Sequence, residues 1–247
     1  MKRIISIMMI FAAFIFCKNI QAQESTALNT LTPQEKKDGV ILLFDGKSTD
    51  QWRGYNKTEF PQVGWNIDDN AIHCISSGKG EAGKGGDIIT KEKYKNFELT
   101  LEWKISPGGN SGIFYLAQEI PDLEIYKSAP EMQVLDNLKH PDAKMGVDGN
   151  RQAGSLYDLI PAKPQNAKPV GEWNTVKIMV YNGTVVHYQN GVQVLEYHLW
   201  TNDWKKMCAN SKFKDYTYFV DTAPEGYIGL QDHGDDVWYR NIKIKKL

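Results

Sequence analysis

The sequence predicts an all-β protein, either a sandwich of two antiparallel sheets or a jelly roll. Short runs of alternating apolar and polar residues recur along the chain, and most are separated by Gly, Asn, Asp or Pro. Aromatic residues, which favour strands, make up 11% of the 247 residues. Many strands with few helices pack as a sandwich or jelly roll. A propeller or solenoid is not expected, because the chain shows no internal repeat of about 33–45 residues.

The alternating pattern predicts strands at 40–44, 65–67, 71–75, 87–90, 97–105, 111–118, 131–136, 173–181, 184–189, 192–199, 227–231 and 237–245. Asn182-Gly183 and Asn190-Gly191 each separate two such runs, which is the strongest short signal for a two-residue hairpin. The segments 137–170 and 200–225 lack strand patterning. Because long loops in a compact domain usually carry function, we expect both segments to cover a site.

The N-terminal segment has the pattern of a signal peptide. Lys2 and Arg3 precede an apolar run over 4–16 that is too short to span a bilayer, and Ala22 offers a small residue for cleavage. We therefore expect a signal peptide at 1–22 and export of the protein, with the periplasm as its compartment. No stable membrane span is expected once the signal is removed.

The rest of the chain is predicted to form a linker at 23–38 and a single domain at 39–247. In the linker, Thr32, Pro33 and Glu35 indicate a capped helical turn before the first strand.

Two cysteines, Cys74 and Cys208, remain after the predicted signal is removed. An oxidising compartment permits a disulfide between them, and two buried free thiols are an equal alternative because the spacing does not decide.

The charge of the chain excludes two classes of partner. The net charge is −1 and no block of Lys or Arg stands out. Nucleic acids and anionic membrane surfaces are therefore not expected to bind.

Three of the predicted strands divide into a core face and a polar face. The residues predicted to be buried between the sheets are Phe97, Leu99, Leu101, Trp103, Met132, Val134, Ile228 and Leu230. The polar faces carry Glu102, Lys104, Glu131, Gln133, Gln231 and His233. If these strands are neighbours in one sheet, the polar groups line one pocket. Ordinary solvated charge pairs are the alternative for Glu102 and Lys104.

Arg240, in the second strand of the C-terminal hairpin, is predicted to join this pocket. By strict alternation it shares a face with Ile242 and Ile244. It can turn outward only if a β-bulge intervenes near Asn241.

Seven motifs are spread, in order, over nearly the whole chain beyond the signal. They are LFDGKSTDQW (43–52), NFELTLEWKISPGGNSGIFY (96–115), EMQVLD (131–136), GSLYDL (154–159), GEWNTVKI (171–178), YQNGVQVLEY (188–197) and GYIGLQDHGDDVWYRNIKI (226–244). Together they resemble the bacterial family of 3-keto-disaccharide hydrolases, also described as 3-keto-glucoside 1,2-lyases and 2-hydroxy-3-keto-glucal hydratases. The resemblance implies a concanavalin-like jelly-roll sandwich of two antiparallel sheets and cleavage of oxidised sugars.

The chemistry of that family needs a base, an enolate stabiliser and an acid for the leaving group. A ketone at C3 acidifies the proton on C2, a base removes it, the C1 substituent leaves by β-elimination, and water then adds back. His233 or Glu131 would be the base. Lys104, Arg240 or a bound divalent cation would stabilise the enolate. Glu102 or Tyr157 would assist the leaving group.

Further side chains complete the expected site. The residues expected to bind substrate are Lys104, Asn110, Ser111, Gln133, Asp136, Tyr157, Gln231 and Arg240. No cofactor is required by this chemistry, and a divalent cation is compatible with it; His233 with Glu131 or Asp136 is the pair to test as its ligands. The chain has no GxGxxG after a strand, so the resemblance implies a 3-keto saccharide or glycoside made by a separate upstream sugar oxidoreductase.

Two other functions stay open. An ordinary glycosidase needs two carboxyl groups about 5–5.5 Å apart for retention or about 6.5–9.5 Å for inversion. Glu98 and Glu102 lie roughly 13 Å apart along one strand, which is too far. Glu102 and Glu131 could still approach closely if their strands are adjacent. A non-catalytic sugar-binding module would use the Trp and Tyr platforms and the amide side chains of the same groove.

Overall fold

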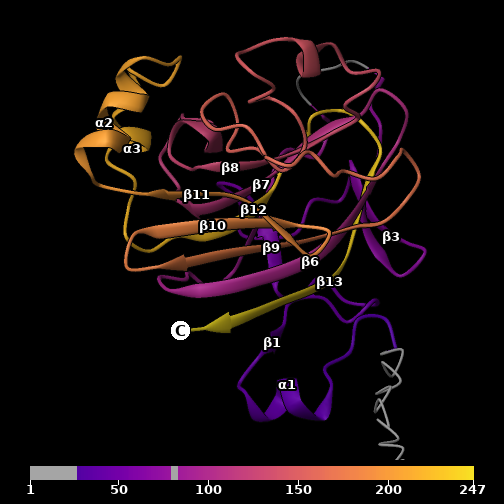
Figure 1. Ribbon diagram of the computed structural model, residues 1–247. Coiled ribbons are helices and arrows are strands. Elements are labelled where there is room, and N and C mark those ends of the chain that lie inside the picture. The colour runs from indigo at the N-terminus through magenta and orange to yellow at the C-terminus, as the bar shows by residue number, and fades with distance from the viewer. Residues whose placement is uncertain (1–26, 79–82) are drawn as a thin grey trace, which may run out of the picture.

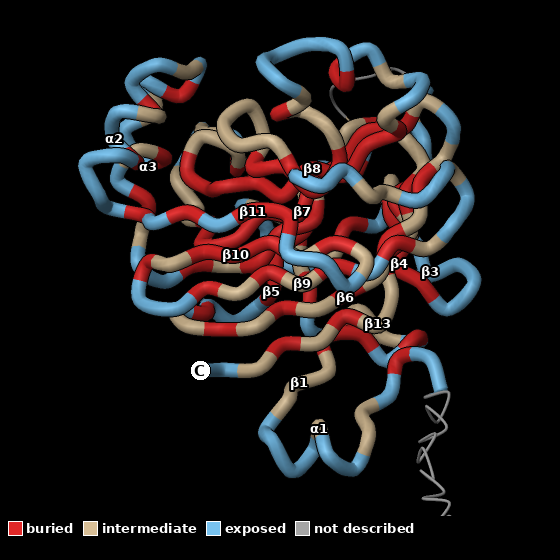
Figure 2. Tube along the Cα trace, viewed as in Figure 1, coloured by how far each residue is buried: buried red, intermediate tan, exposed pale blue. Residues whose placement is uncertain are grey.

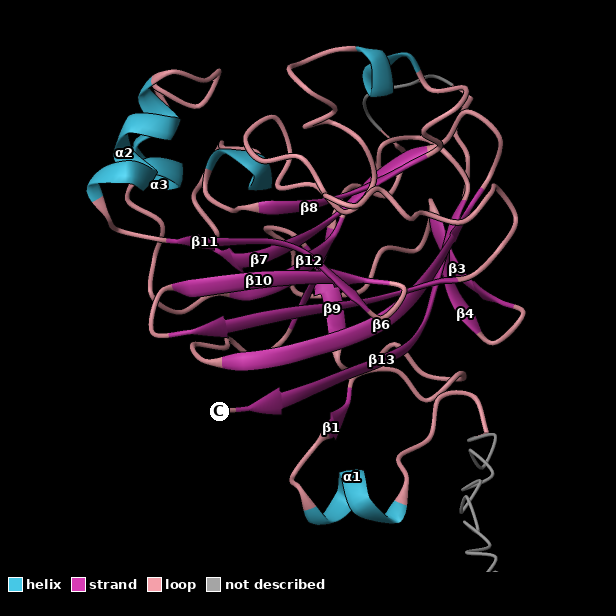
Figure 3. Ribbon diagram, viewed as in Figure 1, coloured by secondary structure: helices cyan, strands magenta, loops and turns pink. Residues whose placement is uncertain are grey.

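The computed structural model describes residues 27–78 and 83–247, and its elements are mostly strands (Figure 1, Figure 3). The strands are β1 (Ile41–Leu42), β2 (Trp52–Gly54), β3 (Trp65–Asp68), β4 (Ala71–Cys74), β5 (Ile88–Thr90), β6 (Phe97–Ile105), β7 (Asn110–Ala117), β8 (Glu131–Leu135), β9 (Asn174–Tyr181), β10 (Thr184–Gln189), β11 (Val192–His198), β12 (Tyr227–Leu230) and β13 (Val237–Lys246). The helices are α1 (Pro33–Lys37), α2 (Asn202–Ala209) and α3 (Thr217–Val220), with 3₁₀ turns η1 (Ile125–Lys127) and η2 (Pro141–Lys144).

Within the described ranges the strands form two antiparallel sheets packed face to face. The eight-stranded sheet has the order β11-β10-β9-β6-β13-β4-β3, with β1 also paired to β13. The five-stranded sheet has the order β2-β5-β12-β7-β8. The predicted sandwich of two antiparallel sheets is therefore confirmed, whereas the predicted signal peptide at 1–22 lies outside the described residues.

The strand predictions agree closely with the structure. Each predicted strand is present with its ends shifted by two residues or fewer. The pattern missed β2, because three residues are too short to show an alternation. It also missed α2 and α3, which Figure 1 shows together at the left edge of the molecule.

Two Asn-Gly pairs form the predicted hairpins. Asn182 and Gly183 have φ values of 48° and 84°, and they connect β9 to β10. Asn190 and Gly191 have φ values of 50° and 81°, and they connect β10 to β11. Positive φ at both central positions is the type I′ geometry, which matches the twist of the strands that it joins.

The core lies between the sheets, where apolar side chains of both inner faces meet. In β6 buried residues alternate strictly with partly exposed ones, as the sequence predicts. The eight residues predicted to be buried are each at most 1% exposed: Phe97, Leu99, Leu101, Trp103, Met132, Val134, Ile228 and Leu230. Figure 2 shows that β7 and β8 are buried along their whole length. Because side chains on both faces of these strands are buried, other segments of the chain must cover the outer face of the five-stranded sheet.

A β-bulge in β13 turns Arg240 outward, as expected. The register with β6 shifts between Arg240 and Lys243, and Asn241 lies inside the shift with φ 51°. Asn241 and Asn29 exchange hydrogen bonds, with N···O distances of 2.6 and 2.7 Å. The bulge therefore also attaches the N-terminal segment to the sheet.

The helical turn predicted before the first strand is confirmed as α1. Thr32 and Glu35 form a complete capping box, and Pro33 is the first helical residue. Lys243 of β13 reaches Glu35 with an N···O distance of 2.8 Å, so the turn is held against the sheet.

Cys74 and Cys208 are both buried free thiols, which decides between the two alternatives in the described part of the chain. Among the helices in that part, none has the length and apolar character needed to cross a bilayer.

Candidate active site

A pocket of about 470 Å³ lies over the outer face of the five-stranded sheet. Strands β7, β8 and β12 provide its floor, and the segments expected to cover a site provide part of its walls, through Tyr157 and Lys212. The residues that line it are Gly83, Gly86, Asp87, Asn110, Glu124, Tyr126, Ala129, Glu131, Gln133, Tyr157, Lys212, Phe213, Tyr216, Phe219, Gln231, Asp232 and His233. Six predicted site residues are among them: Asn110, Glu131, Gln133, Tyr157, Gln231 and His233.

Gly112, which has no side chain, makes room for Glu131 in the floor of the pocket. Gly112 of β7 lies opposite Gln133 of β8 in the register, and its carbonyl accepts a hydrogen bond from the Gln231 backbone at 3.0 Å. A Cβ atom on Gly112 would stand 2.0 Å from Glu131 Oε1. The carboxyl group of Glu131 therefore lies over Gly112 of β7.

The Gly112→Ala variant should lose turnover at least tenfold, on the order of a misplaced catalytic group. The new methyl group occupies the place of the Glu131 carboxyl group, and Glu131 is only 7% exposed, so it has little room to move. Overpacking of this kind also costs about 1–3 kcal/mol of unfolding free energy. Steady-state kinetics and thermal unfolding measure the two effects.

The matched control for that variant replaces Glu131 by the shorter aspartate. Gly112→Ala combined with Glu131→Asp should recover most of the lost stability, because the shorter side chain no longer reaches the added methyl group. A Gly112→Ala enzyme with wild-type turnover would contradict the placement of Glu131.

Burial makes Glu131 an unusually basic carboxylate. Loss of solvation raises the pKa of Glu131 to about 8, against the opposing charge of Lys212, and the charges of Asp87 and Asp142 raise it further. Burial lowers the pKa of Lys212, against the attraction of Asp158 and Glu131. A carboxyl group and an ammonium group thus face the same enclosed space with both pKa values moved toward neutrality.

The wall around Tyr157 holds Lys212 in place. The Lys212 ammonium lies 4.0 Å from the centroid of the Tyr157 ring, although Lys212 as a residue is exposed. The Tyr157 hydroxyl donates to Asp142 Oδ2 at 2.8 Å, and Arg151 bonds both Asp142 and Asp158. Burial and the bond to Asp142 raise the pKa of Tyr157, so the phenol stays protonated.

Asp87 and Lys212 are pocket residues that the sequence did not single out. Asp87 precedes a short strand at the end of a Gly-rich turn, and burial of its carboxyl group raises its pKa to about 7. Lys212 stands among Phe213, Tyr216 and Phe219 in a segment without strand periodicity. The one available signal was a pair of lysines, Lys212 and Lys214, among closely spaced aromatic residues.

The end of the pocket near β13 carries His233 and Asn110. Asn110 Nδ2 lies 3.3 Å from His233 Nε2, and the Asn110 backbone donates to Asp235 Oδ2 at 3.0 Å. The His140 ring meets the His233 ring edge to face, with centroids 6.3 Å apart. Asn110 Oδ1 and Gln231 Oε1 are buried and accept no hydrogen bond from any described residue. Buried acceptors left in that state are expected to take donors from a ligand.

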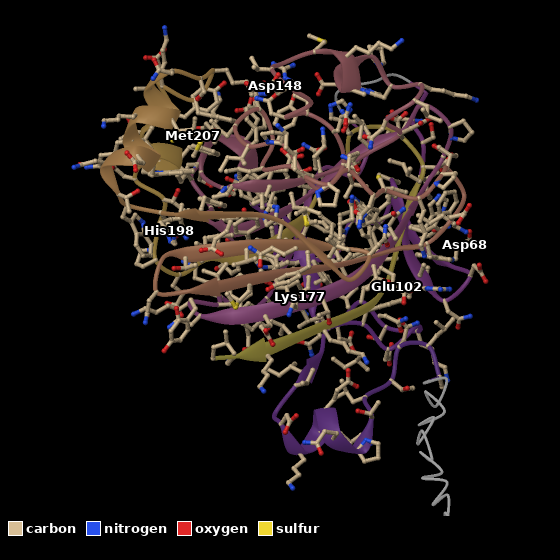
Figure 4. The ribbon with its side chains drawn as sticks, in the orientation of Figure 1. Asp68, Glu102, Asp148, Lys177, His198 and Met207 are labelled. Carbon is tan, nitrogen blue, oxygen red and sulfur yellow. The ribbon has the colours of Figure 1, made fainter. Side chains whose placement is uncertain are left out.

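Glu102, Lys104 and Arg240 do not line this pocket, and this part of the expectation is wrong. They lie on β6 and β13 of the eight-stranded sheet, on the face directed away from the core. In Figure 4 Glu102 lies right of centre at about mid-height, whereas Met207 of α2 and Asp148 lie nearer the top, on the side of β8. Alternation fixes the face of a strand but not the sheet that the strand joins.

These residues form an ion pair and cation–π contacts instead. Arg240 Nε donates to Glu102 Oε2 at 2.7 Å, and the Arg240 guanidinium lies 3.8 Å from the centroid of the Trp173 ring. Lys104 Nζ lies 5.0 Å from the centroid of Trp173 and 4.7 Å from that of Trp238. Because Glu102 and Glu131 belong to different sheets, they do not form the carboxyl pair of an ordinary glycosidase.

Ser111 and Asp136 also lie outside the pocket. Ser111 Oγ donates to the Gln231 carbonyl at 2.7 Å and is 2.7 Å from the Tyr239 hydroxyl, inside the core. Asp136 accepts three backbone N–H bonds, from residues 108, 138 and 139, and so fixes two turns. In the described ranges no group of three or more His, Cys, Asp or Glu side chains could hold a metal ion.

Replacing Glu102 by Gln should leave turnover within about twofold of wild type, because this residue lies on the other sheet. The loss of its ion pair should cost about 1 kcal/mol of unfolding free energy at most. Kinetics on the purified variant and thermal unfolding measure both quantities. A large loss of turnover would place Glu102 back in the site.

Comparisons with known proteins identify the family of the chain and agree with its fold. Residues 39–245 match the family model described as a 3-keto-alpha-glucoside-1,2-lyase-like domain. A 3-keto-disaccharide hydrolase from Bacteroides thetaiotaomicron (strain VPI-5482) is 52% identical over 255 aligned residues, covering 95% of this chain and 87% of that protein. The crystal structure of a proposed glycosyl hydrolase from Parabacteroides distasonis ATCC 8503 superposes with a TM-score of 0.79, at 30% identity, over 90% of this chain and 100% of that one. A second structure from the same organism, also of a proposed glycosyl hydrolase, has a TM-score of 0.62 at 26% identity, with 80% and 100% covered.

Proposed function

The chain belongs to the 3-keto-alpha-glucoside-1,2-lyase-like domain family, and from this premise we propose that it cleaves 3-keto-glycosides by removing the C2 proton and eliminating the C1 substituent. Membership of this family indicates that the chain cleaves carbohydrates. The observation that carries the finer proposal is the carboxyl group of Glu131, buried over Gly112 and facing the charge of Lys212.

Glu131 is the proposed base. A carbon acid next to a ketone needs a base of raised pKa, and burial supplies that to Glu131. His233 lies toward the β13 end of the pocket beside Asn110, where it is suited to bind a sugar hydroxyl group. We therefore assign proton abstraction to Glu131 and substrate binding to His233.

Lys212 is the proposed stabiliser of the enolate. Removal of the C2 proton puts negative charge on the C3 oxygen, and an ammonium group in an enclosed site stabilises it more than water does. Asn110, Gln133 and Gln231 present amide groups to the same space, where they can hold the other sugar oxygens.

The proposed reaction steps balance in atoms and protons. The C2–H bond breaks and its proton goes to Glu131, the enolate expels the C1 oxygen, and a C1=C2 double bond forms. Water then adds its oxygen to C1 while Glu131 returns a proton to C2. The departing C1 oxygen gains one proton and the added water releases one, so these two also balance. The net reaction is hydrolysis, and the base ends in its starting state.

Turnover should depend on the ionised form of Glu131. For a substrate whose leaving group needs no proton, the rate should rise about tenfold per pH unit well below the pKa of about 8 and level off above it. Lys212 faces Glu131, and Asp87 and Asp142 lie near it. The charges of these three residues therefore influence the pH at which the rate levels off. A pH–rate profile that is flat between about pH 6 and 9 would exclude Glu131 as the base.

Incorporation of solvent deuterium tests the elimination mechanism. Cleavage in D₂O should give a 3-keto-glucose that carries deuterium at C2, in excess of the exchange shown by authentic 3-keto-glucose incubated alone. A product free of C2 deuterium would mean direct displacement at C1.

Direct displacement is the second candidate, because Asp87 and Glu131 line the same pocket. Two carboxyl groups that share a site can act as acid and base of an ordinary glycosidase. That enzyme would cleave the unoxidised glycoside, without deuterium at C2. A sugar-binding module would bind both sugars and cleave neither.

The source of the substrate follows from the chemistry. A 3-keto-glycoside has to be made by oxidation at C3, so we propose a separate sugar oxidoreductase as the preceding enzyme. We further propose, from the apolar run at 4–16 behind Lys2 and Arg3, that the protein acts after export.

A further inference from the structure

A second pocket of about 650 Å³ adjoins the first and shares a wall with it. It is lined by Tyr55, Asn56, Lys57, Gly85, Gly86, Asp87, Pro121, Asp122, Leu123 and Glu124. Gly86, Asp87 and Glu124 line both pockets. The two pockets therefore meet at Asp87.

The second pocket is built for a polar ligand with apolar faces. Tyr55, Pro121 and Leu123 offer apolar surface, and Asn56, Lys57 and Asp122 offer hydrogen-bonding groups. A sugar ring has this combination of C–H faces and hydroxyl groups.

The walls of the second pocket are fixed by hydrogen bonds. The Asn56 backbone donates to Glu119 Oε1 at 2.8 Å, and Glu119 is held by Arg53. Lys57 Nζ donates to the Gly85 carbonyl at 3.1 Å, which joins one wall to the segment that carries Asp87.

Asp87 stands at the border with one oxygen fixed. Asp87 Oδ1 accepts a hydrogen bond from the Asp232 backbone at 2.9 Å, and Asp232 Oδ2 in turn accepts from the backbones of Gly85 and Gly86 at 2.9 and 3.0 Å. No hydrogen bond from a described residue reaches Asp87 Oδ2. That oxygen is left to meet a ligand.

We propose that the second pocket binds the leaving group, a second sugar unit, and that Asp87 donates a proton to the glycosidic oxygen as its bond to C1 breaks. The inference rests on the proposed elimination. Asp87 becomes a carboxylate when the sugar leaves, and it takes a proton back from the water that adds to C1, so the cycle closes. The raised pKa of Asp87, about 7 because of burial, leaves a substantial share of this carboxyl group protonated near neutral pH.

Leaving-group dependence tests the role of Asp87. The Asp87→Asn variant should lose about 10²–10⁴-fold in turnover of a 3-keto-disaccharide, because an acid of this kind typically contributes that much. The same variant should lose less than about tenfold with the 4-nitrophenyl 3-keto-glucoside, whose leaving group departs without a proton. It should also keep the exchange of the C2 proton with D₂O. Equal losses with both leaving groups, or no loss with either, would overturn the assignment.

A steric block tests the second pocket. Leu123→Trp should raise KM for the 3-keto-disaccharide at least about tenfold and leave methyl 3-keto-glucoside within about twofold, because only the former reaches past Asp87. Leu138→Trp, at a residue 80% exposed and outside both pockets, is the matched control and should change neither. Equal effects of Leu123→Trp on both substrates would overturn the subsite.

The two proposals fail in different ways. If the product of the wild-type enzyme in D₂O carries no deuterium at C2, the elimination itself is wrong. If wild type exchanges and cleaves while Asp87→Asn behaves as wild type with every leaving group, only the inference about Asp87 is wrong.

Discussion

The Glu131→Gln variant should lose about 10²–10⁴-fold in turnover while its sugar affinity changes little. Proton abstraction is a transition-state event, and the amide keeps the shape of the side chain but removes its basicity. The buried position of Glu131 over Gly112 leaves no described carboxylate in the same place to substitute for it. Steady-state kinetics and calorimetric titration with a non-cleaved 3-keto sugar measure the two quantities.

Proton exchange provides the sharper readout for that variant. Wild type should exchange the C2 proton of a bound 3-keto sugar with D₂O, and Glu131→Gln should not. The matched comparison is His233→Ala, which should bind substrate more weakly but retain exchange. If His233→Ala abolishes exchange and Glu131→Gln keeps it, the two roles are reversed.

The Trp204→Ala variant should lower the unfolding free energy by about 3–5 kcal/mol, the usual cost of removing a large buried aromatic side chain. Trp204 is 1% exposed and stacks between Tyr197 of β11 and Phe219 of α3, with centroids 5.5 Å away on each side. Its indole N–H also donates to the Val220 carbonyl at 2.8 Å. For a domain of this size the midpoint of thermal unfolding should fall by roughly 6–20 °C.

The effect of Trp204→Ala should reach the pocket. Phe219 stacks on Phe213 at 4.0 Å, and Phe213 is the neighbour of Lys212 in the pocket wall. We therefore expect a higher KM as well as a lower melting temperature. Tyr218→Ala, at a residue 51% exposed in the same segment, is the control and should change stability by less than about 0.5 kcal/mol. Equal destabilisation by both variants would contradict the anchoring role of Trp204.

The sequence predicted the strands well because each carries its own evidence. Period-2 alternation identified β6 and the buried face of β8, and two Asn-Gly pairs identified the turns on either side of β10. Even the bulge at Asn241 followed from a conflict between alternation and the outward position expected for Arg240. Local patterns of this kind need no knowledge of the rest of the fold.

The candidate site was only partly predictable, because it depends on which strands become neighbours. Glu131, Gln133 and Gln231 come from β8 and from the end of β12, which flank β7 in one sheet. Glu102 has the same local pattern but belongs to β6 in the other sheet. Strand order is set by contacts between residues far apart in the sequence, which alternation does not report.

Lys212 and Asp87 were missed for a different reason. Neither stands on the polar face of a strand, since Lys212 follows α2 and Asp87 immediately precedes β5. Their relevance arises from burial and from proximity to Glu131, and both properties exist only in the folded chain.

The most direct test of the central claim is cleavage of a matched pair of substrates by the purified protein. The pair is a 3-keto-disaccharide and its unoxidised parent, which differ only by the ketone at C3. We predict that the keto compound is consumed, with solvent deuterium at C2 of the 3-keto-glucose product, while the parent is left intact. Cleavage of the parent at a similar rate, without deuterium at C2, would contradict the elimination mechanism.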